Sequence, residues 1–112
     1  MPSKNAQEPF YRVTVQEAKE MVGDGAYVVD VREAHEFVTG HVPGAAHIPV
    51  ATVFTRREEL PKDKKLIFVC AMGQRSALAC EMAAAGGFPA DVLHNLEGGT
   101  EAWVKAGEPV EH

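Results

Sequence analysis

The 112-residue chain contains no apolar run approaching the roughly 20 residues that a membrane-spanning helix needs. Its first twenty residues also lack the continuous apolar stretch of a secretory signal, so we expect a cytoplasmic protein without a membrane partner. The net charge is −5 and no basic run exceeds Arg56–Arg57, which argues against nucleic acid as a direct partner. Only two cysteines are present, ten positions apart, too few for a disulfide framework.

The rest of the composition is typical of a soluble globular domain, with 46% apolar and 24% charged residues. A chain of this length can bury a single core without disulfides or metals. We predict a polar lead over residues 1–8, one domain over 9–108 and a short tail over 109–112. Neither an internal repeat nor a linker divides the chain.

Predicted strands and helices alternate along the chain. The strands cover residues 10–15, 26–32 and 64–70, with a short strand at 46–48, and residues 91–99 hold the last strand and its turn. The helices cover residues 16–22, 33–40, 50–60, 76–87 and 100–107, the last with Thr100 as its N-cap. Because the best strands are rich in valine and read as buried on both faces, we predict an α/β domain with a mainly parallel central sheet and helices on both faces.

The segment "CAMGQRS" directly follows the buried strand "LIFV", where sites form in open parallel sheets. Gly73 allows a sharp turn, and successive amides in such a turn can form an anion-binding nest. A helix starting near Ser76 adds its positive end, and Arg75 adds a cation. All of these favour thiolate at Cys70, although nucleophilicity falls with the pKa and limits the rate gain to a few-fold. The segment therefore predicts a site that binds anions.

"CAMGQRS" resembles the Cys-x-x-Gly-x-Arg-Ser active-site loop of rhodanese-domain sulfurtransferases. Three further stretches match family motifs in the same order, namely "VVDVRE" at 28–33, "EFVTGHVPGAAHIP" at 36–49 and "NLEGGTEAW" at 95–103. The resemblance runs from about residue 10 to 107 and implies a rhodanese-like fold.

The resemblance also implies an activity. Cys70 would take a sulfane sulfur from a donor such as thiosulfate, become a persulfide, and pass the sulfur to cyanide or a thiol. Arg75 matches the position that holds a thiosulfonate-type donor. The amides expected to surround the persulfide belong to Ala71, Met72, Gly73, Gln74, Arg75 and Ser76. No cofactor and no metal are implied.

Three alternatives remain at this point. The protein could be a sulfur-relay carrier that receives its sulfur from a protein persulfide donor. It could also be a non-catalytic binding module, but that reading predicts a missing cysteine, whereas Cys70 is present. A phosphatase is disfavoured because Arg75 follows Cys70 with four residues between them, whereas cysteine phosphatases resemble Cys-x5-Arg.

Other notable residues are better explained by structure than by chemistry. Cys80 lies among small apolar residues of a predicted helix, which favours core packing and leaves a resolving thiol as the alternative. Asp30 and Arg32 are expected to form an ion pair or brace a loop. His41 is expected to brace its loop through a ring nitrogen, and Trp103 to close the core.

The remaining histidines and arginines do not predict a metal site or a further substrate-binding site. His35, His41 and His47 recur every six residues, a spacing that does not favour zinc on one helix face. Arg56 and Arg57 are expected to be solvated, and an accessory contact with the donor is left open.

Overall fold

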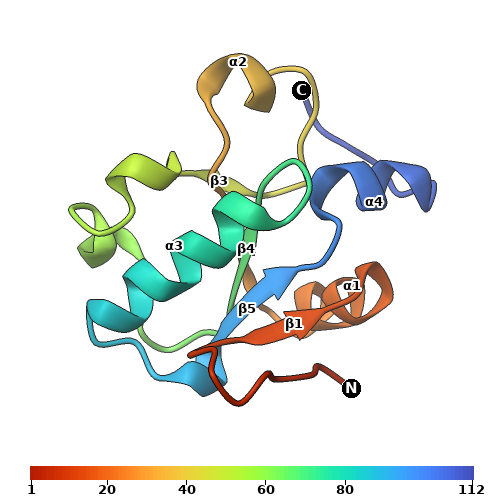
Figure 1. The fold of residues 1–112 in the computed structure, drawn as a ribbon. Coiled ribbons are helices and arrows are strands. Elements are labelled where there is room, and N and C mark those ends of the chain that lie inside the picture. Colours follow the sequence, from red (N-terminus) through yellow and green to blue (C-terminus); the bar gives the residue numbers. More distant parts are fainter.

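The structure is a computed structural model that describes residues 1–112. Five parallel strands form one sheet in the order β1-β5-β4-β2-β3, which confirms the predicted α/β class (Figure 1). The strands are β1 (Tyr11–Val13), β2 (Tyr27–Asp30), β3 (Ala46–His47), β4 (Leu66–Val69) and β5 (Leu93–Leu96). The α-helices are α1 (Val15–Gly23), α2 (Ala34–Phe37), α3 (Gln74–Ala85) and α4 (Gly99–Lys105). No helix combines the length and the apolar character needed to cross a membrane.

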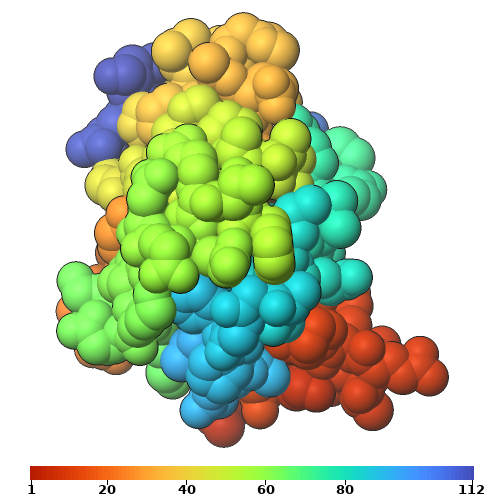
Figure 2. All heavy atoms as spheres, turned by 90° about the vertical axis from the view of Figure 1, so that its left-hand side faces the viewer, coloured from red at the N-terminus to blue at the C-terminus, as the bar shows by residue number.

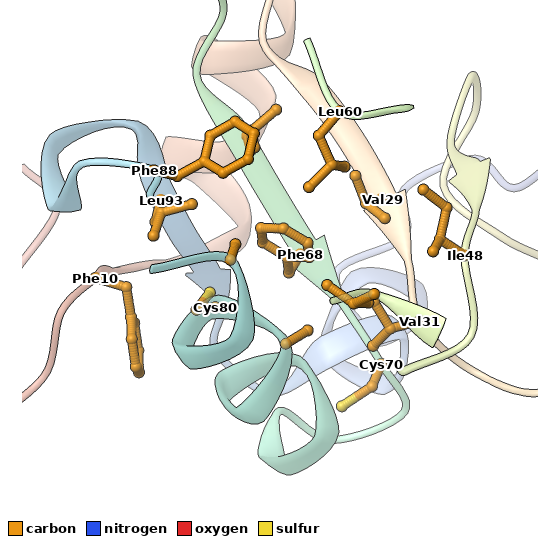
Figure 3. Close-up of a cluster of buried hydrophobic side chains, with 14 residues drawn as sticks. Phe10, Val29, Val31, Ile48, Leu60, Phe68, Cys70, Cys80, Phe88 and Leu93 are labelled. Carbon is orange, nitrogen blue, oxygen red and sulfur yellow. The ribbon is translucent and has the colours of Figure 1, made fainter. Parts of the chain in front are cut away.

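Both faces of the sheet are buried, because side chains along a strand alternate between them. In β4, Leu66 and Phe68 belong to a core cluster that also holds Ala79, Cys80 and Ala83 of α3 (Figure 3). Ile67 and Val69 belong to a second cluster with buried residues of α1 and α4. Cys70 comes two positions after Phe68 and joins the first cluster, so the alternation turns its side chain toward α3.

The predicted helix over residues 50–60 is wrong. The segment instead forms two short 3-10 helices, η1 (Val50–Thr52) and η2 (Arg57–Glu59), and lies across the middle of the face in Figure 2. The hydroxyls of Thr52 and Thr55 donate to carbonyls three residues earlier, at 2.8 and 3.1 Å. Such back-bonding and the β-branched side chains both weaken a regular α-helix, while buried Val53 and Leu60 fix the segment on the core.

The two helices nearest Cys70 begin earlier than predicted. α3 starts at Gln74 rather than near Ser76, with Gly73 as its N-cap. α4 starts at Gly99, so the expected N-cap role of Thr100 is wrong; Gly98 holds that position. Both helices have a glycine with positive φ at the N-cap, Gly73 in α3 and Gly98 in α4, where the sequence analysis expected Thr100 to cap the second.

Both ends of the chain contact the domain. Ser3 pairs with Arg12 of β1, and Glu111 pairs with His41 through isolated antiparallel bridges. Trp103 is buried in the second cluster, and its indole N–H donates to the Pro109 carbonyl at 2.7 Å. The prediction that Trp103 closes the core is confirmed.

Candidate active site

The Cys70 sulfur lies at the carboxyl end of β4 and accepts two hydrogen bonds. The Gly73 amide donates from 3.1 Å and the Ser76 hydroxyl from 3.3 Å. Gly73 has a φ of 115°, a region that favours glycine, and this turn aims its amide back at the sulfur. Cys70 is only 1% exposed, yet its sulfur contacts hydrogen-bond donors as well as hydrocarbon. A main-chain donor and a hydroxyl therefore meet at the predicted thiol.

Two opposing influences act on the pKa of Cys70. Burial is the largest and raises the pKa, since a charged sulfur loses hydration. The Ser76 hydroxyl and the nearby amides of Ser76, Gly73 and Met72 lower the pKa and together outweigh burial, so the pKa lies below its ordinary value. The thiolate is therefore favoured by hydrogen bonding at this position.

The N-terminus of α4 orients the loop by binding its carbonyls. The Thr100 amide and hydroxyl donate to the Cys70 carbonyl at 2.8 and 3.2 Å, and the Glu101 amide donates to the Ala71 carbonyl at 3.1 Å. In a planar trans peptide the N–H points opposite to the C=O. Holding the Ala71 carbonyl toward α4 therefore turns the Met72 amide to the other side, where it contributes to the lowered pKa of Cys70.

Gly99 makes this close approach of α4 and the loop sterically feasible. A Cβ at Gly99 would lie 2.5 Å from the Ala71 carbonyl oxygen and closer still to that of Cys70. Its φ of 60° also belongs to the left-handed region. The glycine pair at residues 98–99 was quoted in the family motif, but its contact with the cysteine loop was not anticipated.

Asn95, in the middle of β5, links two parts of the loop. Its Nδ2 donates to the Gly73 carbonyl at 3.1 Å, and its Oδ1 accepts from the Ser76 hydroxyl. Ser76 has one hydroxyl hydrogen, so Asn95 and the Cys70 sulfur share a single donor. When Cys70 is a thiol, the hydrogen can serve Asn95; when it is a thiolate, the sulfur competes for it. Asn95 was not identified from the sequence. A side-chain amide within a fully buried strand needs hydrogen-bond partners, and this requirement could have pointed to it.

Arg75 forms an ion pair that the sequence analysis did not anticipate. Both terminal nitrogens of its guanidinium donate to the carboxylate of Glu36 in α2, at 2.7 and 2.9 Å. The side chains are 36% and 26% exposed, so the pair lies at the surface of the site. The Arg75 hydrogen bonds are the main reason that the pKa of Glu36 falls from 4.5 to about 2. Glu36 lay inside a quoted family motif, but no role was assigned to it.

A buried ion pair between Arg32 and Asp30 stabilises the segment around α2, which carries Glu36. The Arg32 guanidinium donates to the fully buried Asp30 carboxylate and to the Gly40 carbonyl, both at 2.8 Å. His47 Nε2 contacts the Arg32 carbonyl at 2.7 Å. The expectation that Asp30 and Arg32 form an ion pair and brace a loop is confirmed.

The histidines also serve this segment. His41 Nδ1 contacts the Phe37 carbonyl at 3.0 Å, which confirms its bracing role. The Phe37 ring stacks on His41 and on His47, with centroid distances of 3.7 and 4.4 Å. No group of three or more histidine, cysteine, aspartate or glutamate side chains is arranged to hold a metal ion.

A pocket of about 570 Å³ opens beside the loop, between the α2 segment and α4. Ala71 forms part of its wall next to Cys70, and Glu36 forms part of the opposite wall. Glu101, Val104 and Lys105 line the α4 side. A small molecule entering this pocket would meet the loop that carries the cysteine, with charged groups of both signs around it.

The remaining predicted residues lie away from the sulfur. Cys80 is fully buried in the first cluster, where burial raises its pKa well above the usual value, so core packing is confirmed. Figure 3 shows Cys80 on α3, apart from Cys70 at the end of β4. Arg56 pairs with Glu59, and Arg57 donates to the Phe54 carbonyl. Neither arginine lines the pocket beside the loop.

Comparisons with known proteins identify the family of the chain. The model of the rhodanese-like domain matches residues 14–106. The chain is 33% identical over 94 residues to the thiosulfate sulfurtransferase GlpE of Ectopseudomonas mendocina, covering 84% of each chain. It is 36% identical over 83 residues to a sulfurtransferase of Allochromatium vinosum, covering 74% of this chain and 76% of that one.

A solved structure gives the same result for the fold. The crystal structure of a rhodanese-related protein from Thermoplasma volcanium superposes with a TM-score of 0.80 at 30% identity, covering 89% of this chain and 96% of that one. The chain belongs to the rhodanese-like family. Its similarity to the two sulfurtransferases supports rhodanese-type sulfurtransferase chemistry in general.

Proposed function

We propose that the protein transfers a sulfane sulfur through a persulfide on Cys70. The observation that carries the proposal is the pair of hydrogen bonds to the Cys70 sulfur, from the Gly73 amide at 3.1 Å and the Ser76 hydroxyl at 3.3 Å. These donors favour negative charge on sulfur, which both the thiolate and the ionised persulfide carry. Arg75 and the amides from Ala71 to Ser76 are the donor-binding groups of this proposal.

The reaction has two halves that balance without an external oxidant. The Cys70 thiolate attacks the outer sulfur of thiosulfate, the donor S–S bond breaks, and sulfite leaves with the bonding pair. Cys70 then carries a persulfide with the charge on its terminal sulfur. Cyanide or a thiolate attacks that sulfur, forming thiocyanate or a new persulfide, and the Cys70 thiolate returns.

The donor could also be a persulfide on another protein. Two apolar side chains favour this second candidate: Met72, in the loop, is 51% exposed, and Val104, on the pocket wall, is 55% exposed. Exposed apolar groups around a site are suited to a protein surface. Slow turnover of thiosulfate beside rapid transfer from a protein persulfide would identify a relay carrier. Both cysteines are free thiols, in keeping with a reducing, cytoplasmic location.

Intact-mass spectrometry after incubation with thiosulfate tests the proposal. The wild type should gain the mass of one sulfur atom, and cyanide should remove it. Cys70→Ser should gain nothing, whereas the matched control Cys80→Ala should gain the same mass as the wild type because Cys80 is buried in the core. An adduct that persists in Cys70→Ser, or a wild type that accepts sulfur from no donor, would contradict the assignment.

A further inference from the structure

The guanidinium groups near Cys70 are already paired with carboxylates. Arg75 is bound at both ends by Glu36, and Arg32 is bound by the buried Asp30. Each pair is neutral as a unit. Among the other charged groups of the pocket, Glu101 and Lys105 lie one turn apart on α4 and carry opposite charges, but no ion pair joins them. The site therefore presents no unpaired guanidinium to an incoming anion.

We propose that Glu36 is a specificity-determining residue that disfavours dianionic sulfur donors and favours monoanionic ones, such as thiosulfonates and persulfides. This inference rests on the proposed sulfur-transfer function and defines the class of its donor. A donor that reaches Arg75 approaches the Glu36 carboxylate at the same time. Glu36 cancels the attraction of Arg75 for the donor, and because this attraction grows with donor charge, a dianion loses about twice as much of it as a monoanion.

Glu36 is held in place by more than Arg75. Its Oε1 also accepts the Glu33 amide at 3.0 Å, at the start of α2. The next residue, Phe37, is stacked on His41 and His47. Since the pKa of Glu36 is about 2, the carboxylate is ionised at neutral pH. Neutralisation of Arg75 is therefore a permanent feature of the resting site.

Arg75 keeps a part in donor binding under this proposal. A guanidinium has five N–H donors, and Glu36 uses two of them, one on each terminal nitrogen. The remaining three can orient an oxygen of the donor by hydrogen bonding. The pair as a whole carries no net charge, so it orients the donor without attracting a dianion from solution.

Two small donors allow a direct test, because they differ mainly in charge. Thiosulfate is a dianion, and methanethiosulfonate has the same sulfane sulfur on a sulfonyl centre but is a monoanion. Attack by Cys70 releases sulfite from the first and methanesulfinate from the second. The assay measures kcat/KM for each donor at low salt with cyanide as the acceptor, following thiocyanate.

The decisive variant is Glu36→Gln, which removes the charge and keeps the size of the side chain. We expect kcat/KM for thiosulfate to rise about tenfold and that for methanethiosulfonate to change less than about threefold. The matched control is Glu81→Gln, an exposed carboxylate of α3 outside the pocket, which should alter neither value. An equal loss for both donors, or an unchanged ratio, would overturn the proposal and leave Glu36 as a structural partner of Arg75.

A second measurement uses only the wild type and keeps the proposal open to refutation if Glu36→Gln does not fold, although the net charge of −5 also contributes to it. Screening weakens repulsion, so raising the ionic strength should increase kcat/KM for thiosulfate relative to methanethiosulfonate. A relative decrease would mean that the site attracts dianions, against the proposal. Mass spectrometry separates this failure from failure of the proposed function. If both donors place sulfur on Cys70 but the ratio does not move, only the role of Glu36 is refuted.

Discussion

Replacing Ser76 with alanine should raise the pKa of Cys70. The Ser76 hydroxyl is 3.3 Å from the sulfur, and it is the largest of the influences that lower this pKa. A hydrogen bond to a charged group contributes about 1.5–3 kcal/mol. The bond is long and Asn95 competes for the same hydrogen, so the lower end applies. About 1.4 kcal/mol corresponds to a tenfold fall in the ratio of thiolate to thiol at a fixed pH.

The pH dependence of Cys70 alkylation by iodoacetamide measures this change, with the modified residue located by mass spectrometry. The rate near neutral pH should fall by up to about tenfold in Ser76→Ala, and the midpoint of the profile should move to higher pH. Thr100→Val is the matched control. It removes a hydroxyl that donates to the Cys70 carbonyl at 3.2 Å and not to the sulfur, so its midpoint should match the wild type.

Identical midpoints for Ser76→Ala and the wild type would refute this reasoning. The Ser76 hydroxyl would then keep donating to Asn95 Oδ1 even when Cys70 is ionised, and the amides alone would support the thiolate.

The pH dependence of stability gives an independent check of the direction of the pKa shift. Because the folded pKa of Cys70 is depressed, its ionisation stabilises the fold above the unfolded pKa of about 8.5. This stabilisation is lost as the pH falls through the folded pKa, and in Ser76→Ala the loss should come at higher pH.

Two further predictions concern the supports of the site. Gly99→Ala should lower the Tm by at least about 8 °C in thermal denaturation, since clash with the loop carbonyls and a left-handed alanine together cost about 2 kcal/mol or more. Gly25→Ala, with positive φ but no atom within 4 Å, should lose less, and equal losses would argue against the close contact. In acid, the stabilisation from ionised Glu36 should be present above pH 4.5 and disappear as the pH falls through about 2. The difference in unfolding free energy between the wild type and Glu36→Gln should therefore shrink over that interval, and a constant difference would contradict the depressed pKa.

The fold was predictable where the sequence carries its own pattern. The buried strands β2 and β4 are short, mainly apolar runs between polar turns, and these runs require cover on both faces. Residues 50–60 carry no such pattern. Buried Val53 and Leu60 fit either an α-helix or two 3-10 turns, and packing on the core decides between them. Local sequence does not contain that information.

The residues of the site also fall into a group that the sequence predicted and a group that it did not. Cys70, Gly73 and Ser76 fall within seven consecutive residues, so their meeting at the end of β4 follows from one turn. The groups that were missed come from distant segments. Asn95 is 19 positions from Ser76, and Glu36 is 39 positions from Arg75. A single sequence shows that these residues are polar, but only the packing of β5 and α2 beside the loop shows which partner each one meets.

The sulfur is stabilised by dipoles, and this explains why Arg75 can be committed to Glu36. The amides and the hydroxyl at Cys70 are fixed by α4, Asn95 and the turn at Gly73. They favour negative charge on sulfur at a distance of about 3 Å, where buried hydrogen bonds are strong and salt screens little. Stabilising the sulfur therefore does not require a free cation. The charged groups at the entrance of the site can therefore act on the donor alone, and in this chain the Glu36 carboxylate cancels the charge of Arg75 there.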